Sequence, residues 1–83
     1  MTPTEALAML TAKYSNSQLD TLAEAMSLYL EEDGSALLDL FMEPDTRALA
    51  ADGSQLLKKM PNENLHRLID MIDDHIGKVH ADD

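Results

Sequence analysis

The sequence contains no cysteine among its 83 residues. Disulfide bonds, thiolate metal sites and thiol nucleophiles are therefore excluded, and a small domain without such cross-links is more typical of the cytoplasm than of secreted proteins. Long apolar runs are also missing, so no segment predicts a membrane-spanning helix. The opening Met-Thr-Pro-Thr-Glu lacks the basic start and the apolar run of a signal peptide. We therefore expect a soluble, cytoplasmic protein.

Aromatic residues and glycine are scarce: the chain has two tyrosines, one phenylalanine, no tryptophan and three glycines. The core must therefore consist of leucine, isoleucine, methionine and alanine, most of which favour helices. No stretch alternates between apolar and polar residues as a strand does, and three isolated glycines cannot build a phosphate-binding loop. We predict an all-α fold, a compact orthogonal bundle of four to five short helices, in a single domain over residues 1–83 with a frayed tail from about residue 78.

The first and last helices are predicted from their capping residues and apolar periodicity. Thr2 and Glu5 form a capping box for a helix that ends near Lys13 or Tyr14. Asn62 is expected to cap the last helix, whose apolar stripe is about 100° wide. The residues of this stripe are Leu65, Leu68, Ile69, Ile72, Ile76 and Val79.

A second helix is predicted over about residues 17–32, because Ser15 and Gln18 offer another capping box. Its apolar residues recur at helical spacing, and carboxylates occupy the opposite side. The apolar arc consists of Leu19, Leu22, Ala23, Met26 and Leu30.

Two Asp-Gly-Ser sequences predict breaks between helices. In the first, Gly34 takes the left-handed conformation and Ser35 caps a short helix that runs to Met42. Two more short helices follow, over residues 46–51 and 54–60, separated by the second Asp-Gly-Ser sequence. The two hexapeptides Asp-Gly-Ser-x-Leu-Leu resemble each other. Either an internal duplication or the ordinary frequency of glycine and serine between helices accounts for the resemblance.

Basic residues are missing from Tyr14 to Thr46, a stretch that holds eight carboxylates. The net charge of −10 is unevenly distributed: residues 1–46 carry −8, residues 47–69 carry +2 and residues 70–83 carry −4. A dense field of one sign repels nucleic acid and anionic membranes and attracts basic protein surfaces. We therefore predict no direct binding of nucleic acid or membrane.

Helical phasing places three carboxylates of the second helix on one face, with Leu28 beside them. Together with Leu38 and Met42, Leu28 either forms an apolar patch rimmed by carboxylates, which is typical of a protein-binding surface, or packs within the bundle. The three carboxylates are Asp20, Glu24 and Glu31, and the full predicted partner-binding set adds Leu28, Glu32, Asp33, Asp39, Met42 and Glu43.

An alternative site lies on the last helix, where His66, Asp70 and Asp73 occupy positions i, i+4 and i+7 and share one face. Imidazole and carboxylate groups at this spacing can bind zinc or another transition metal, although a solvated polar face has the same pattern. The main prediction is a protein without metal or cofactor, and these three residues are the alternative metal site.

A second alternative involves Ser35. The sequence Asp33-Gly34-Ser35-Ala36-Leu37 resembles the attachment site of acyl carrier proteins, which are also small, acidic and four-helical and carry a serine at the start of their second helix. Gly34 and Ala36 interrupt the Asp-Ser-Leu run of that family, and Pro44 shortens the helix that the family uses for recognition. The resemblance implies a covalently modified Ser35 as an alternative cofactor site.

No catalytic constellation accompanies the acidic stretch, so the sequence predicts a small, non-enzymatic protein-protein interaction module. Its partner would be a basic protein surface, including that of a nucleic-acid-binding protein. Nuclease inhibitors, immunity proteins, antitoxin-like modules and phage-encoded blockers of nucleic-acid-binding machinery are comparable in charge and size. An acyl-carrier-like or a weakly metal-binding helical protein is the alternative, and both a monomer and a homodimer are compatible with the sequence.

Overall fold

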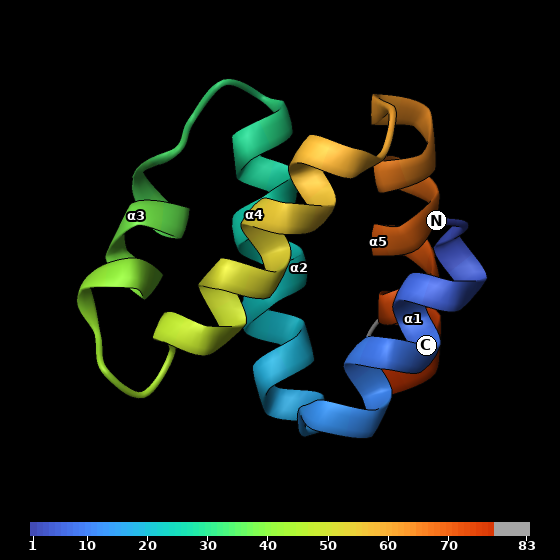
Figure 1. Cartoon of the computed structure of the whole chain (residues 1–83), viewed down its shortest axis with the longest axis horizontal. Helices are drawn as coiled ribbons and strands as arrows, with labels where there is room; N and C mark the ends of the chain where they lie inside the picture. Colours follow the sequence, from blue (N-terminus) through green and yellow to red (C-terminus); the bar gives the residue numbers. More distant parts are fainter. Residues whose placement is uncertain (78–83) are drawn as a thin grey trace.

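A computed structural model describes residues 1–77, which form five α-helices and no strand (Figure 1). The all-α prediction is therefore confirmed. The predicted fraying from about residue 78, and Val79 of the apolar stripe, lie outside the described residues. The helices are α1 Pro3–Lys13, α2 Asn16–Leu30, α3 Ser35–Met42, α4 Arg47–Lys59 and α5 Asn62–Ile76.

Helix α2 is central to the arrangement. It packs against α5 on one side and against α3 and α4 on the other, while α1 packs mainly on α5. Figure 1 shows the consequence: α3 lies at one end of the molecule, α1 and α5 lie at the other, and α2 and α4 cross between them. Helices α3 and α5 thus lie on opposite sides of α2.

The starts of α1 and α2 follow the predicted local chemistry. In α1, the Glu5 backbone N–H donates to Thr2 Oγ1 at 3.1 Å and the Thr2 N–H donates to Glu5 Oε1 at 2.8 Å. Ser15 and Gln18 form the same reciprocal pair at the start of α2. These capping boxes satisfy backbone donors that have no partner within the helix.

The main core lies between α1, α2, α4 and α5. Burying one leucine side chain contributes about 1.5–3 kcal/mol, so this core accounts for most of the apolar stabilisation. A much smaller cluster, formed by Ala25, Leu37 and Ala50, anchors α3 to α2 and α4. Nine large side chains of the main core are almost completely buried: Leu10, Leu19, Leu22, Met26, Leu49, Leu56, Leu65, Leu68 and Ile72.

The predicted break at the second Asp-Gly-Ser sequence is wrong, because α4 is continuous through Asp52, Gly53 and Ser54. The glycine serves helix packing and makes no turn: a Cβ added at Gly53 would lie 2.6 Å from Leu22 Cδ1. Its absence lets α4 approach α2 closely. The first Asp-Gly-Ser sequence precedes and opens a helix, so the two similar hexapeptides have different structures.

The first junction is also built differently from the prediction. Glu32 takes the left-handed conformation, with φ 66°, whereas Gly34 has φ −86°. Ser35 does not cap α3, because it is the first residue of the helix. Instead the Asp33 carboxylate accepts hydrogen bonds from the Ser35 backbone N–H at 3.1 Å and from its hydroxyl at 2.7 Å.

Helix α5 shows one further difference. Pro61 occupies the N-cap position and Asn62 is the first helical residue, without a side-chain capping bond. The predicted apolar stripe is otherwise confirmed in the described residues, since its first four members are buried and Ile76 is half-buried. Gly77 ends the helix in the left-handed conformation, with φ 74°.

Candidate protein-binding surface

Helix α3 carries the candidate site and packs against α2 and α4 with only one buried residue. Leu37 is its one buried residue, and Leu40 is half-buried against α2 and α4. The C-terminal end of α3 is fixed by the next segment, because Thr46 Oγ1 donates to the Leu40 carbonyl at 2.7 Å and Arg47 Nε donates to the Phe41 carbonyl at 3.1 Å. These bonds satisfy carbonyl groups at the end of α3 and hold the helix in position. The helix cannot continue past this point because Pro44 has no backbone N–H to donate.

The outward side of α3 exposes large apolar side chains. Leu38 is 60% exposed and Met42 is 71% exposed, and their i, i+4 spacing places them on one face of the helix. They therefore do not pack within the bundle, which was one of the two interpretations of the sequence. Asp39 and Glu43, also four residues apart, are exposed beside them.

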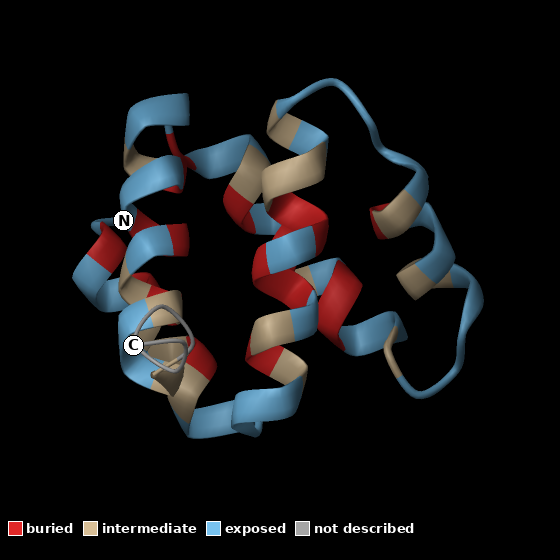
Figure 2. Ribbon diagram, turned by 180° about the vertical axis from the view of Figure 1, so that it is seen from behind, coloured by how far each residue is buried: buried red, intermediate tan, exposed pale blue. Residues whose placement is uncertain are grey.

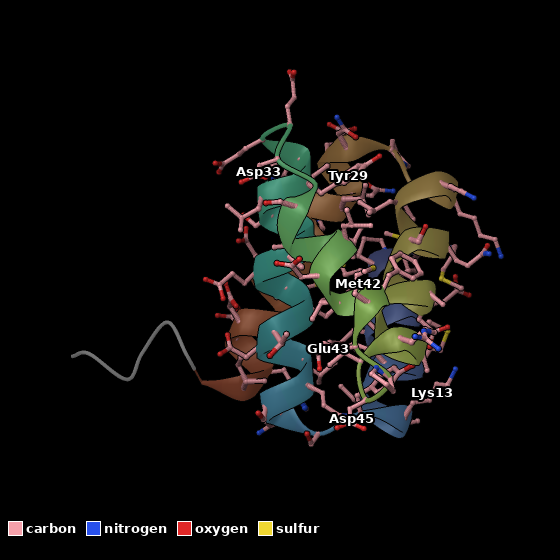
Figure 3. All side chains as sticks on the ribbon, turned by 90° about the vertical axis from the view of Figure 1, so that its left-hand side faces the viewer. Lys13, Tyr29, Asp33, Met42, Glu43 and Asp45 are labelled. Atoms are coloured by element: carbon pink, nitrogen blue, oxygen red, sulfur yellow. The ribbon has the colours of Figure 1, made fainter. Side chains whose placement is uncertain are left out.

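Near the start of α3, the end of α2 contributes a third exposed apolar side chain. Tyr29 is 47% exposed, and its ring lies 3.6 Å from the position of a Cβ added to Gly34. Figure 3 looks onto this side and shows Tyr29 and Asp33 toward one end of α3, with Met42 and Glu43 toward the other. The α3 surface is hereafter the set Tyr29, Asp33, Leu38, Asp39, Met42 and Glu43.

One carboxylate of the α3 surface, that of Asp33, has a lowered pKa. At Asp33 the Ser35 hydroxyl and then the Ser35 backbone N–H donate hydrogen bonds to the carboxylate, and these bonds lower its pKa below the ordinary value. Both bonds are local to the α2–α3 connection. Asp33 thus contributes a carboxylate to the α3 surface and also stabilises the connection that leads into α3.

The structure brings the predicted partner-binding residues together on adjoining elements, because α2 and α3 pack against each other. Asp20 and Leu28 are half-buried, and the other seven predicted residues are exposed. Tyr29 and Leu38 are missing from the predicted set. The signal for Tyr29 was its type: it is an aromatic residue within a stretch that has no basic residue, and tyrosine is enriched at protein interfaces.

Leu28 lies between two pockets on the outward side of α2. One pocket, of about 260 Å³, faces α5, and the other, of about 270 Å³, faces α3. Leu28 and Glu24 line both pockets and so form a ridge between them. The rear view in Figure 2 shows α2 between α5 and α3. The pocket facing α3 is completed by Thr21, Ala25, Ala36 and Leu40.

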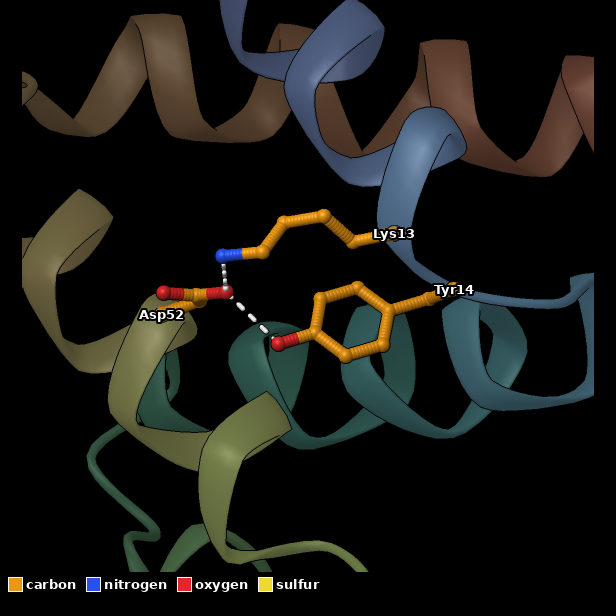
Figure 4. Close-up of polar contacts among 3 residues, drawn as sticks. All are labelled: Lys13, Tyr14 and Asp52. Carbon is orange, nitrogen blue, oxygen red and sulfur yellow. Dashed lines mark hydrogen bonds and ion pairs between the residues drawn. The ribbon is translucent and has the colours of Figure 1, made fainter.

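A separate polar cluster joins α1 to α4 (Figure 4). Asp52 Oδ2 accepts a hydrogen bond from the Tyr14 hydroxyl at 2.6 Å and forms an ion pair with Lys13 Nζ at 2.9 Å. Burial, followed by the hydrogen bond to Asp52 and its charge, raises the pKa of Tyr14 to about 12. Burial alone would raise the pKa of Asp52, but the bonds from Tyr14 and Lys13 and the lysine charge lower it. This cluster fastens two helices and lies outside the α3 surface.

The alternative metal site is not assembled. His66 and Asp70 are exposed and Asp73 is half-buried, and within residues 1–77 no three histidine or carboxylate side chains are placed to hold a metal ion. The alternative residue Ser35 is exposed at the start of α3, a helix of eight residues, with its hydroxyl bonded to Asp33.

Comparison of the chain with models of protein families, with curated proteins and with solved structures finds no match. Among the described helices, none is both long enough and apolar enough to cross a membrane. Fold and surface together define a small acidic all-α globule that exposes apolar side chains on one short helix.

Proposed function

We propose that the protein is a non-enzymatic interaction module that docks the α3 surface on a basic surface of a partner protein. The observation that carries the proposal is the exposure of Leu38 and Met42, at 60% and 71%, beside the exposed carboxylates of Asp39 and Glu43. Exposed apolar side chains rimmed by charge are typical of protein-binding sites. The same acidity disfavours a phosphate backbone or an anionic membrane as the ligand.

The two components of the surface have different roles. Asp39 and Glu43 attract a basic partner and suppress other partners, because long-range charge complementarity raises the association rate. Leu38, Met42 and Tyr29 stabilise the docked complex, because apolar and aromatic groups at the centre of an interface dominate affinity. The carboxylates alone would not give a long-lived complex, and the apolar side chains alone would not select the partner.

The proposed partner class follows from this chemistry. A basic patch is typical of proteins that bind nucleic acid, so occupation of that patch would block their function. Immunity proteins, nuclease inhibitors, antitoxin-like modules and phage-encoded blockers are comparable small acidic proteins. The absence of cysteine favours a cytoplasmic site of action.

The proposal is tested by capturing partners from the native host with tagged protein and mapping the contact by cross-linking and hydrogen exchange. We expect protection over residues 29–43. The variant Asp39→Lys/Glu43→Lys should lose the partner, whereas Glu63→Lys/Asp70→Lys, with the same charge change on exposed α5 positions, should retain it. Equal loss in both variants, or protection confined to α5, would show that the α3 surface is not the docking site.

The exposed Ser35 hydroxyl at the start of α3 supports a second candidate function, that of an acyl-carrier-like protein. Its hydrogen bond to Asp33, at 2.7 Å, holds the hydroxyl at the surface. Intact-mass measurement of protein purified from its native host decides this candidate: a covalent adduct that disappears in Ser35→Ala supports it, and an unmodified chain contradicts it.

A further inference from the structure

The groove between α2 and α5 combines apolar walls with acidic groups. Its lining consists of Ala23, Glu24, Ser27, Leu28, Ile69 and Asp73, and its volume is about 260 Å³. Leu28 and Ile69 supply apolar surface from the two helices, and Glu24 and Asp73 supply a carboxylate from each. The groove adjoins the pocket beside α3, with which it shares Glu24 and Leu28.

The two carboxylates of the groove have no partner within residues 1–77. Neither Glu24 nor Asp73 makes a side-chain hydrogen bond or an ion pair there, and Asp73 Oδ1 is buried from solvent with no hydrogen-bond donor. A carboxylate that has no donor within the protein is stabilised by a partner group that donates to it. Two carboxylates beside apolar walls suit a cationic donor with an apolar stem.

We propose that this groove receives an arginine side chain of the basic partner, an inference that rests on the proposed function and names the residue type that the partner presents. The methylene stem of arginine packs between Leu28 and Ile69. The guanidinium group donates to the Asp73 carboxylate and, through another N–H, to Glu24 on the other wall. The interface thus extends from the α3 surface across the Glu24–Leu28 ridge to α5.

Arginine fits this groove better than lysine for a geometric reason. The guanidinium is planar and carries five N–H donors, so it can serve carboxylates on two walls at once. An ammonium group is a compact, strongly hydrated charge that loses more hydration on entering an apolar groove. A second copy of this chain is disfavoured as the occupant, because each copy carries a net charge of −10.

The test uses two amphipathic helical peptides that are identical except that all basic residues are arginine in one and lysine in the other. Peptide affinity is measured by fluorescence anisotropy, and the contact is mapped by amide chemical shifts on isotope-labelled protein. We expect the arginine peptide to bind about tenfold more tightly, with shift changes at Leu28, Ile69 and Asp73. This preference should fall to near unity in Asp73→Asn and persist in Glu63→Gln, a control on the same helix.

The outcomes separate this inference from the proposed function. Shift changes confined to the α3 surface, with equal affinities for the two peptides, overturn the arginine groove and leave the docking surface supported. Absence of binding by either peptide contradicts both. Salt-sensitive self-association that disappears in Arg67→Ala would assign the groove to a second copy and likewise overturn the inference. Because the shift map uses unaltered protein, the test does not depend on the folding of a variant.

Discussion

Replacing Gly53 by alanine tests how closely α4 and α2 pack. In an ordinary helix interior, Gly→Ala stabilises by about 1 kcal/mol. Here the new Cβ would lie 2.6 Å from Leu22 Cδ1, which belongs to a fully buried side chain. Insertion of a methyl group into such a packed core costs about 1–3 kcal/mol. The opposing contributions leave an expected net destabilisation of about 1 kcal/mol.

The assay is urea unfolding followed by circular dichroism, with two companion variants. Ala51→Gly, at an exposed position of α4, measures the intrinsic helix contribution and should cost about 1 kcal/mol. Leu22→Val removes the atom that the new methyl group meets, so Gly53→Ala should become neutral or stabilising in that background. If Gly53→Ala alone stabilised the protein by as much as Ala51→Gly destabilises it, the close approach of the two helices would be refuted.

Further predictions concern pH, the end of α5 and the exposed residues of α3. The pKa of Tyr14 is raised from 10.0 to about 12, so its contribution to stability is complete below pH 10 and is lost as the pH rises toward 12. Over this pH range the free energy of unfolding should therefore fall by about 1 kcal/mol more in wild type than in Tyr14→Phe. Gly77→Ala should lower the free energy of unfolding by about 1 kcal/mol, measured by thermal unfolding, because Gly77 has φ 74°. Leu38→Ser/Met42→Ser should change stability in urea by less than about 0.5 kcal/mol while abolishing partner capture; a large loss of stability would indicate that these side chains are buried.

The elements at the two ends of the chain could be predicted because their signals are local. The capping boxes of α1 and α2 involve residues three apart, and the apolar stripe of α5 follows from helical periodicity alone. The middle could not be predicted in the same way. In the sequence, Gly53 predicts a helix break. Its role in packing depends on its contact with Leu22, which exists only in the folded state.

The charge of the candidate surface was predictable, whereas the sequence left two interpretations open for its apolar part. Carboxylates are rarely buried, so the exposure of Asp39 and Glu43 follows from their chemistry. The exposure of Leu38 and Met42 depends on the partners of α3, and a short helix with one buried residue, Leu37, leaves most of its surface uncovered. The groove at Asp73 likewise requires α5 to lie beside α2.

The central claim is that a basic partner docks on the α3 surface, and the salt dependence of its affinity tests that claim most directly. Dissociation constants for the captured partner are measured from low to high ionic strength for wild type and for Asp39→Lys/Glu43→Lys. The account predicts that wild-type affinity falls steeply with salt, that the variant binds at least about tenfold more weakly at low salt, and that the two converge as screening increases. A wild-type affinity that stays constant across the range, or a variant that binds as tightly as wild type, would contradict it.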